Sequence, residues 1–107
     1  MANSFNTQTA DETEDELSDG ETILHYVIVT NPGDTLAYLK FWDDVPGNVD
    51  PASDPHVVRV GVPPGATIVT WLGDVRCAAG CSIGAVRDAG VGVTDPVTDL
   101  VATVFYN

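Results

Sequence analysis

Residues 23–42 read ILHYVIVTNPGDTLAYLKFW, and this stretch decides the fold of the chain. Its first part is rich in β-branched and aromatic side chains, which favour strands, and the NPGD that follows is a strong turn signal. In its last part, alternation places Leu39 and Phe41 on one face of a strand and Lys40 on the other. We expect the Leu39 face to enter the core, because Lys40 would have to extend along the opposite face to reach water.

Further strand-like segments follow at short intervals, separated by Gly, Pro and Asp. They cover residues 56–62, 66–72, 76–86 with a break at Gly80, and 100–106. With no convincing helix between them, they predict an all-β fold, a small β-sandwich of immunoglobulin-like or jelly-roll-like type. The expected core residues are Leu39, Phe41, Ile68, Val104 and Tyr106.

The first 21 residues differ sharply from the rest of the chain. They hold seven of the 16 acidic residues and no basic one, and their only large apolar side chains are Phe5 and Leu17. Such a segment buries too little surface to offset the entropy of ordering. We therefore expect an extended acidic N-terminal arm, residues 1–21, that is disordered until docked, and a β-sandwich domain over residues 22–107.

The formal net charge of −12 limits the classes of partner. It repels phosphate backbones and anionic lipid, so we expect no nucleic-acid binding and no membrane binding. The N-terminus carries no basic segment followed by an apolar run, which predicts synthesis in a host cytoplasm without a targeting signal. In that compartment Cys77 and Cys81 are expected to be reduced, buried thiols, with a small disulfide across a tight turn as the alternative.

The polar residues assemble no motif of catalysis or metal binding. The loop with Asp43, Asp44, Asp50 and Asp54 invites a calcium site, but it lacks the register of such loops, and Asp beside Pro and Gly is ordinary turn chemistry. His25, His56, Cys77 and Cys81 are zinc-ligand types at a spacing that matches no zinc finger or ribbon. No serine lies in a nucleophile elbow and no Gly-rich loop precedes a helix. We expect no enzyme, no catalytic residue, no cofactor and no metal.

Aromatic side chains offer one further alternative. A sugar-binding face could be lined by Trp42, Trp71, Tyr26 and Tyr38. Aromatic residues in strands more often pack in a core or between sheets, and we favour packing for these four.

Several short motifs in the chain carry a family resemblance. They are Asn31, LAYLKFWD at 36–43, Asp54-Pro55, VPPGA at 62–66, AGCSIGAV at 79–86, Asp95 and the closing strand 100–106. In this order they resemble a group of small tailed-phage virion proteins. The resemblance covers most of residues 23–107 and leaves out the acidic arm. It implies a β-sandwich that decorates a capsid or belongs to a tail or fibre assembly, with no catalytic residues.

Resemblance and charge together predict a capsid decoration, or cement, protein that binds the major capsid protein at the surface of the virion. The arm would dock on a basic groove of the shell, and its expected partner-binding residues are Phe5, Asp11, Glu12, Glu14, Asp15, Glu16 and Leu17. We also expect a homo-oligomer, a dimer or trimer, because virion positions are usually symmetric. The alternatives are a tail or head-fibre component and, in another class, a sandwich module that binds a ligand such as a carbohydrate.

Overall fold

A computed structural model of the chain describes residues 4–10, 15–18, 20–49, 54–86 and 100–107. Within these residues the secondary structure is strands apart from one short 3-10 helix, η1 at Pro46–Asn48, so the predicted all-β fold is confirmed. The strands are β1 (Ser4–Ala10), β2 (Asp15–Ser18), β3 (Thr22–Thr30), β4 (Ala37–Trp42), β5 (Val58–Val62), β6 (Thr67–Cys77), β7 (Cys81–Val86) and β8 (Leu100–Tyr106).

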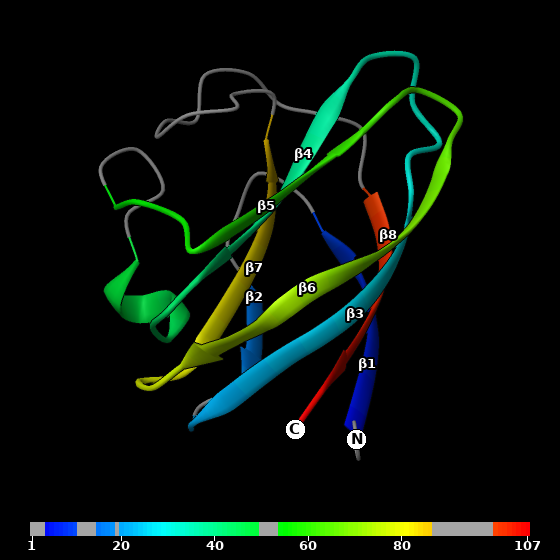
Figure 1. Ribbon diagram of the computed structural model, residues 1–107. Coiled ribbons are helices and arrows are strands. Elements are labelled where there is room, and N and C mark those ends of the chain that lie inside the picture. Colours follow the sequence, from blue (N-terminus) through cyan, green and yellow to red (C-terminus); the bar gives the residue numbers. More distant parts are fainter. Residues whose placement is uncertain (1–3, 11–14, 19, 50–53, 87–99) are drawn as a thin grey trace.

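The strands form two four-stranded sheets that pack face to face as a β-sandwich (Figure 1). Sheet A has the strand order β1-β8-β3-β6, and sheet B has the order β2-β7-β4-β5. Every neighbouring pair of strands is antiparallel. The side chains between the two sheets form the core.

The connectivity follows one simple rule. The first described strand pairs with the last, β2 with β7, β3 with β6, and β4 with β5. The chain is thus a long antiparallel hairpin that folds over itself, and the fold brings β3 beside β8 and β4 beside β7. This nested pairing of eight strands in two sheets is the jelly-roll arrangement, one of the two sandwich types expected from the sequence.

The core lies where strand alternation predicts it. Leu39, Phe41 and Val104 are completely buried, and Ile68 and Tyr106 are partly buried against the same cluster. Burial of these side chains is the main favourable term in the stability of the sandwich.

Asn31, one of the residues that carry the resemblance, connects two turns of the chain. Its side-chain amide is buried and donates to the carbonyl oxygens of Thr35 at 2.8 Å and Val62 at 2.9 Å. The backbone carbonyl of Asn31 accepts a hydrogen bond from the Gly65 amide at 2.9 Å. Asn31 therefore joins the β3–β4 turn to the β5–β6 turn, which are two of the motifs quoted above.

The acidic segment contributes a strand to each sheet, whereas its composition predicted an arm that is disordered until docked. β1 pairs with β8 over its whole length, and β2 pairs with β7. Leu17 is only 5% exposed and belongs to the core cluster. Pairing with β8 and β7 supplies hydrogen bonds and burial that the isolated segment lacks, and this tertiary context outweighs its composition.

Lys40 differs from the expectation, because the second face of β4 is covered as well, whereas the burial of Trp42 on that face agrees with the packing expected for it. Lys40 is 1% exposed and Trp42 is 3% exposed, although both point away from the core between the sheets. The indole Nε1 of Trp42 donates to the backbone oxygen of Asp54 at 3.2 Å. The loop between β4 and β5 therefore folds back over the outer face of sheet B.

Candidate functional site

The outer face of sheet A is exposed and apolar. Cross-strand register places Tyr26 opposite Trp71, and Ile28 opposite Val69 in the next row. Val101 follows in a third row, opposite Thr30. We call the five exposed apolar side chains Tyr26, Ile28, Val69, Trp71 and Val101 the sheet A face.

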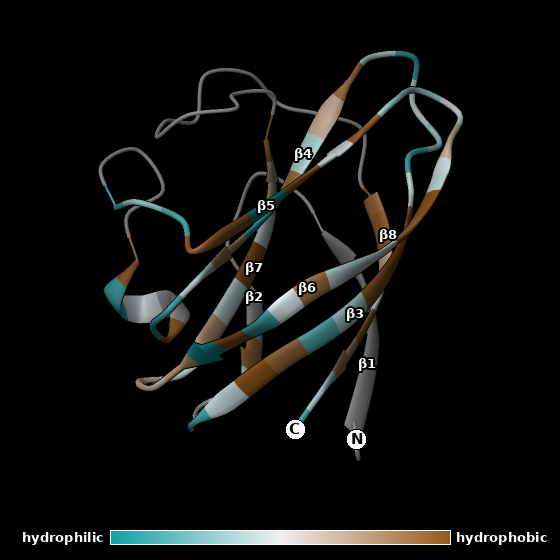
Figure 2. Ribbon diagram, viewed as in Figure 1, coloured by the Kyte–Doolittle hydropathy of each residue, from teal (hydrophilic) through white to brown (hydrophobic). Residues whose placement is uncertain are grey.

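Four side chains of the sheet A face, Tyr26, Ile28, Val69 and Trp71, lie in two adjacent rows of β3 and β6, and Val101 lies in the third row opposite Thr30. Val69 is 68% exposed and Trp71 is 58% exposed, and β3 and β6 lie side by side with apolar segments along both (Figure 2). Single exposed apolar residues are normal, but a contiguous patch on a sheet marks an interaction surface or a ligand site. None of its five residues carries a charge, although the chain as a whole has a net charge of −12.

A β-bulge shapes one end of this face. Leu24 pairs with Val75 while Tyr26 pairs with Trp71, so β6 carries extra residues at this point. Gly73 and Asp74 in the bulge have φ values of 83° and 54°. The left-handed conformation is ordinary for glycine and uncommon for other residues, with Asp among the better tolerated.

The bulge brings three polar groups together. Asp74 Oδ1 accepts a hydrogen bond from Trp71 Nε1 at 3.2 Å and lies 2.6 Å from His25 Nδ1. The hydrogen bond with His25, and then that with Trp71, lowers the pKa of the Asp74 carboxyl below its usual value. An ionised carboxylate only accepts, so Nδ1 is the protonated nitrogen of His25 in this contact.

This histidine–carboxylate pair does not have the geometry of a general base. Its second nitrogen, His25 Nε2, is buried and has no hydrogen-bond partner. A general base must reach the proton that it removes, directly or through one water molecule. In this arrangement Nδ1 of His25 is bonded to Asp74, Nε2 is enclosed, and Asp74 also accepts from the Trp71 indole.

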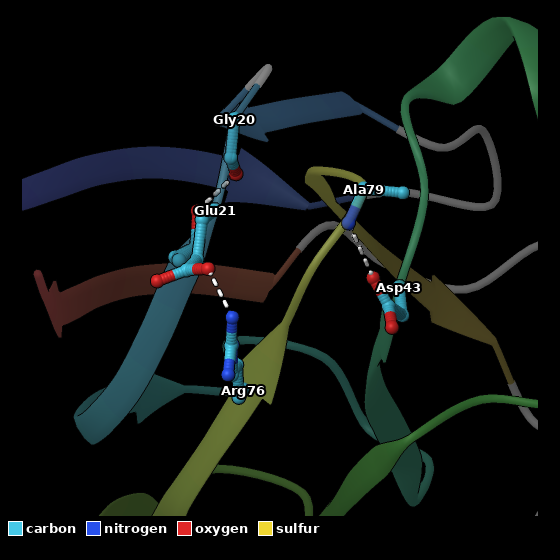
Figure 3. Close-up of polar contacts among 6 residues, drawn as sticks. Gly20, Glu21, Asp43, Arg76 and Ala79 are labelled. Atoms are coloured by element: carbon cyan, nitrogen blue, oxygen red, sulfur yellow. Dashed lines mark hydrogen bonds and ion pairs between the residues drawn. The ribbon is translucent and has the colours of Figure 1, made fainter.

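The Asp-rich loop surrounds an open cavity of about 370 Å³ next to Trp42. Two of the carboxylates that line it, those of Asp43 and Asp44, accept hydrogen bonds from nearby groups. Asp43 Oδ1 accepts from the Ala79 amide at 3.1 Å (Figure 3), and Asp44 Oδ1 accepts from the amides of Val45 and Asn48 at 2.8 and 3.2 Å. Asp50 lies outside the described residues. Within the described residues no three metal-ligand side chains converge on one point.

The two cysteines are free thiols, both buried, at the end of β6 and the start of β7. A hydrogen bond with Cys77, together with burial, raises the pKa of the Cys81 thiol. A protonated, buried thiol behaves as a small apolar side chain, as the sequence predicted.

The structure separates the residues that the sequence grouped as sites. Leu17 is in the core and is not available to a partner in this arrangement. Phe5 lies on β1, and Asp15 and Glu16 lie on β2, and for these three residues the structure describes the backbone but not the side chain. Asp11, Glu12 and Glu14 lie outside the described residues. Of the four aromatic residues considered for sugar binding, only Tyr26 and Trp71 meet. Trp42 is buried, and Tyr38 lies under the Arg59 guanidinium at 5.8 Å.

Sequence reasoning missed the sheet A face, although one signal was present. Alternation in residues 66–72 places Val69 and Trp71 on the same side of a strand, opposite the expected core residue Ile68. The position of Tyr26 on the outer face depends on the bulge. The bulge reverses the alternation of β3, so that Leu24 and Val27 both face the core and Tyr26 faces outward.

Comparisons with family models, curated proteins and solved structures found no match to this chain. In the described part of the chain, no helix has the length and apolar character needed to cross a membrane.

Proposed function

We propose that this chain is a non-enzymatic structural protein of a phage virion, most simply a capsid decoration protein that binds and stabilises a shell of major capsid protein. The observation that carries the proposal is the sheet A face, an uncharged and exposed apolar surface on a strongly acidic β-sandwich. The resemblance of residues 23–107 to small virion proteins of tailed phages supplies the class of partner.

The physical logic of decoration suits this surface. Apolar side chains at the centre of an interface hold a complex, whereas surrounding charge steers the encounter and selects the partner. An acidic protein is attracted to a shell whose binding site has a basic rim. The affinity of each single contact can be low, because a lattice presents many binding sites. Bound copies that bridge neighbouring capsid subunits oppose the separation of those subunits.

The acidic residues of the first 21 positions keep a role as steering charges in this proposal. Removing the whole segment is a poor test, because it removes β1 and β2 from the sheets along with the charge. The double substitution Glu12→Gln and Glu14→Gln removes two negative charges and keeps the size and shape of both side chains. It should weaken binding to shells at low salt and flatten the salt dependence, since exposed charges are screened over about 10 Å at 0.1 M.

The decisive experiment uses empty shells assembled from the major capsid protein encoded in the same genome. Purified protein should co-sediment with the shells to a saturating, stoichiometric level and should raise the temperature at which they fall apart. Val69→Asp, on the sheet A face, should abolish binding. Val57→Asp is the matched control, because Val57 is also an exposed valine, 41% accessible, but lies outside that face. Failure of the unaltered protein to bind shells would refute decoration and favour a tail or head-fibre position.

One observation favours a second class of function. Tyr26 and Trp71 are exposed cross-strand neighbours, and paired aromatic rings on a sheet can stack on sugar rings. A carbohydrate module should show a saturable change in tryptophan emission when titrated with soluble glycans. Decoration predicts no such change.

Self-association is a further part of the proposal. Symmetric sites on a virion favour closed dimers or trimers. In the described sheets β1 and β6 end sheet A, and β2 and β5 end sheet B, so four strand edges are candidates for pairing between copies. Sedimentation velocity over a range of concentrations should detect the oligomer, and a monomer throughout that range would leave the lattice as the sole source of symmetry.

A further inference from the structure

We infer that Trp71 is the anchor of the sheet A face and that Asp74 and His25 hold its indole ring in position for an apolar pocket on a capsid subunit. The inference rests on the proposed function, because it names the side chain through which the shell would be bound.

The first step of the argument is the exposure of Trp71. A tryptophan that is 58% accessible leaves a large apolar area in water, and its neighbours Tyr26 and Val69 extend that area across two strands. Tryptophan and tyrosine are enriched among the few residues that supply most of the energy of protein interfaces. Trp71 is the larger of the two aromatic residues on the face and the one whose ring is tied to other groups.

The second step is the way in which the ring is held. Trp71 Nε1 donates to Asp74 Oδ1 at 3.2 Å, and the same oxygen is 2.6 Å from His25 Nδ1. The His25 side chain is only 14% exposed, so it forms a firm base for the carboxylate. A side chain that is already immobilised loses less entropy when it binds, and rigid aromatic anchors therefore improve affinity.

The third step is the backbone. A regular β3–β6 ladder would not place a carboxylate beside the indole, since Asp74 owes its position to the bulge and to its left-handed φ of 54°. Bulges commonly redirect side chains near functional sites, and sparsely populated backbone conformations persist where the surrounding structure requires them. The bulge thus fixes the orientation of the Trp71 ring by placing Asp74 beside it.

The chemistry of the face indicates the occupant. The rows around Trp71 are uncharged, which fits an apolar pocket in a protein surface, and a net charge of −12 argues against a phosphate-rich ligand. The Asp74 carboxylate, 55% exposed beside the indole, fits a partner with a basic group at the rim of that pocket. A second copy docked through the same face would bring another Asp74 carboxylate and no basic group to this position, so a capsid subunit is the better occupant.

The test compares four variants of the full chain in binding to empty shells of the major capsid protein. Trp71→Ala should weaken binding at least thirtyfold, the effect expected of an interface hot spot. Asp74→Gly keeps the backbone conformation but removes the carboxylate, and should weaken binding about two- to tenfold through the freed ring. Asp74→Asn retains an oxygen acceptor and tolerates the same φ, so it should bind within about twofold of the unaltered protein. Val57→Ala is the control and should show no change.

A second readout isolates the positioning effect in the free protein. The chain contains two tryptophans, so incorporation of 5-fluorotryptophan gives two ¹⁹F resonances, and Trp71→Ala identifies one of them. In Asp74→Gly the Trp71 resonance should narrow and move toward the position of a freely solvated indole, whereas in Asp74→Asn it should stay in place. Unchanged resonances in Asp74→Gly would overturn the positioning role.

The outcomes separate the two proposals. If the unaltered protein does not bind shells, decoration fails and the anchor fails with it. If it binds and Trp71→Ala binds equally well, decoration stands and only the anchor is overturned. If Asp74→Gly frees the ring without any loss of affinity, Trp71 acts without the help of Asp74 and His25.

Discussion

The two sheets of this sandwich share one core but differ on their outer faces. On sheet B, Lys40 and Trp42 point outward and are nonetheless buried, at 1% and 3% exposure. On sheet A, Tyr26 and Trp71 point outward and remain about half exposed, at 51% and 58%. The outer face of sheet B is thus covered at Lys40 and Trp42, whereas sheet A leaves its apolar outer face open.

The difference arises from one loop. Between β4 and β5 the chain returns over sheet B, where the Asp54 carbonyl accepts from the Trp42 indole and the Asp44 carbonyl accepts from the Ser82 hydroxyl at 2.6 Å. The Val57 amide then donates to the Phe41 carbonyl at 2.8 Å. The loop therefore covers the outer aromatic ring of sheet B and accepts hydrogen bonds from the Trp42 indole and the Ser82 hydroxyl. By contrast, the exposed side chains of sheet A are suited to contacts with another molecule. Substitutions on the two faces should therefore change the stability of the protein by different amounts.

The largest expected effect separates the two tryptophans. Trp42→Ala should reduce the free energy of unfolding by about 3–5 kcal/mol, because it opens a cavity beneath the loop. Trp71→Ala should reduce it by about 1 kcal/mol, because an exposed ring loses only its cross-strand pairing and one solvent-exposed hydrogen bond to Asp74. Urea denaturation of both variants measures the difference. Similar losses in the two proteins would contradict the contrast between an internally closed face and an open one.

The next prediction concerns Leu17, which the sequence assigned to a docking arm and the structure places in the core. Leu17→Ala should destabilise the isolated protein by about 2–5 kcal/mol, the usual cost of truncating a buried leucine. Leu36→Ala is a matched control, because Leu36 is 45% exposed and should change stability by less than about 0.5 kcal/mol. A negligible effect of Leu17→Ala would restore the view of residues 1–21 as an arm that orders only on docking.

Much of the fold was predictable because it depends on local patterns. Strand alternation identified Leu39, Phe41 and Val104 as core residues, and turn chemistry located the boundaries of most central strands. The strands of residues 4–10 and 15–18 were not predictable, since their pairing with β8 and β7 is non-local and opposes their composition.

The candidate site was harder to predict than the fold. Alternation in residues 66–72 already places Trp71 opposite the core, but the bulge at Gly73 and Asp74 decides that Tyr26 joins it and that His25 meets a carboxylate 49 residues away. Burial of Lys40 on the outer face of β4 is likewise a result of tertiary structure that alternation along the strand does not reveal. Residues placed by bulges and returning loops are those for which periodicity carries the least information.

A pH titration probes the closed face through His56. Burial first, and then the positive charges of Lys40 and Arg59, lower the pKa of His56 below its usual 6.5. The unfolded chain therefore takes up this proton first, so the stability contributed by the neutral imidazole is complete above about pH 6.5 and declines as the pH falls below it. Urea midpoints measured at pH 7.5, 6.5 and 5.5 should decrease, and His56→Gln should remove most of this decrease. A stability that is flat or rises over the same interval in the unaltered protein is the opposite result.

The smallest expected effect is that of the Glu21–Arg76 ion pair, which joins the segment before β3 to the end of β6 on sheet A (Figure 3). The two side chains are 55% and 65% exposed, so water and salt compete for both charges. A double-mutant cycle with Glu21→Gln and Arg76→Gln should give a coupling energy of about 0–1 kcal/mol, falling further in 1 M salt. The same cycle on Trp42 and Ser82, which the loop covers on sheet B, should give a coupling that salt does not change. A large, salt-insensitive coupling between Glu21 and Arg76 would mean that this end of sheet A is also shielded from water, and the contrast between the two sheets would then be confined to the rows around Trp71.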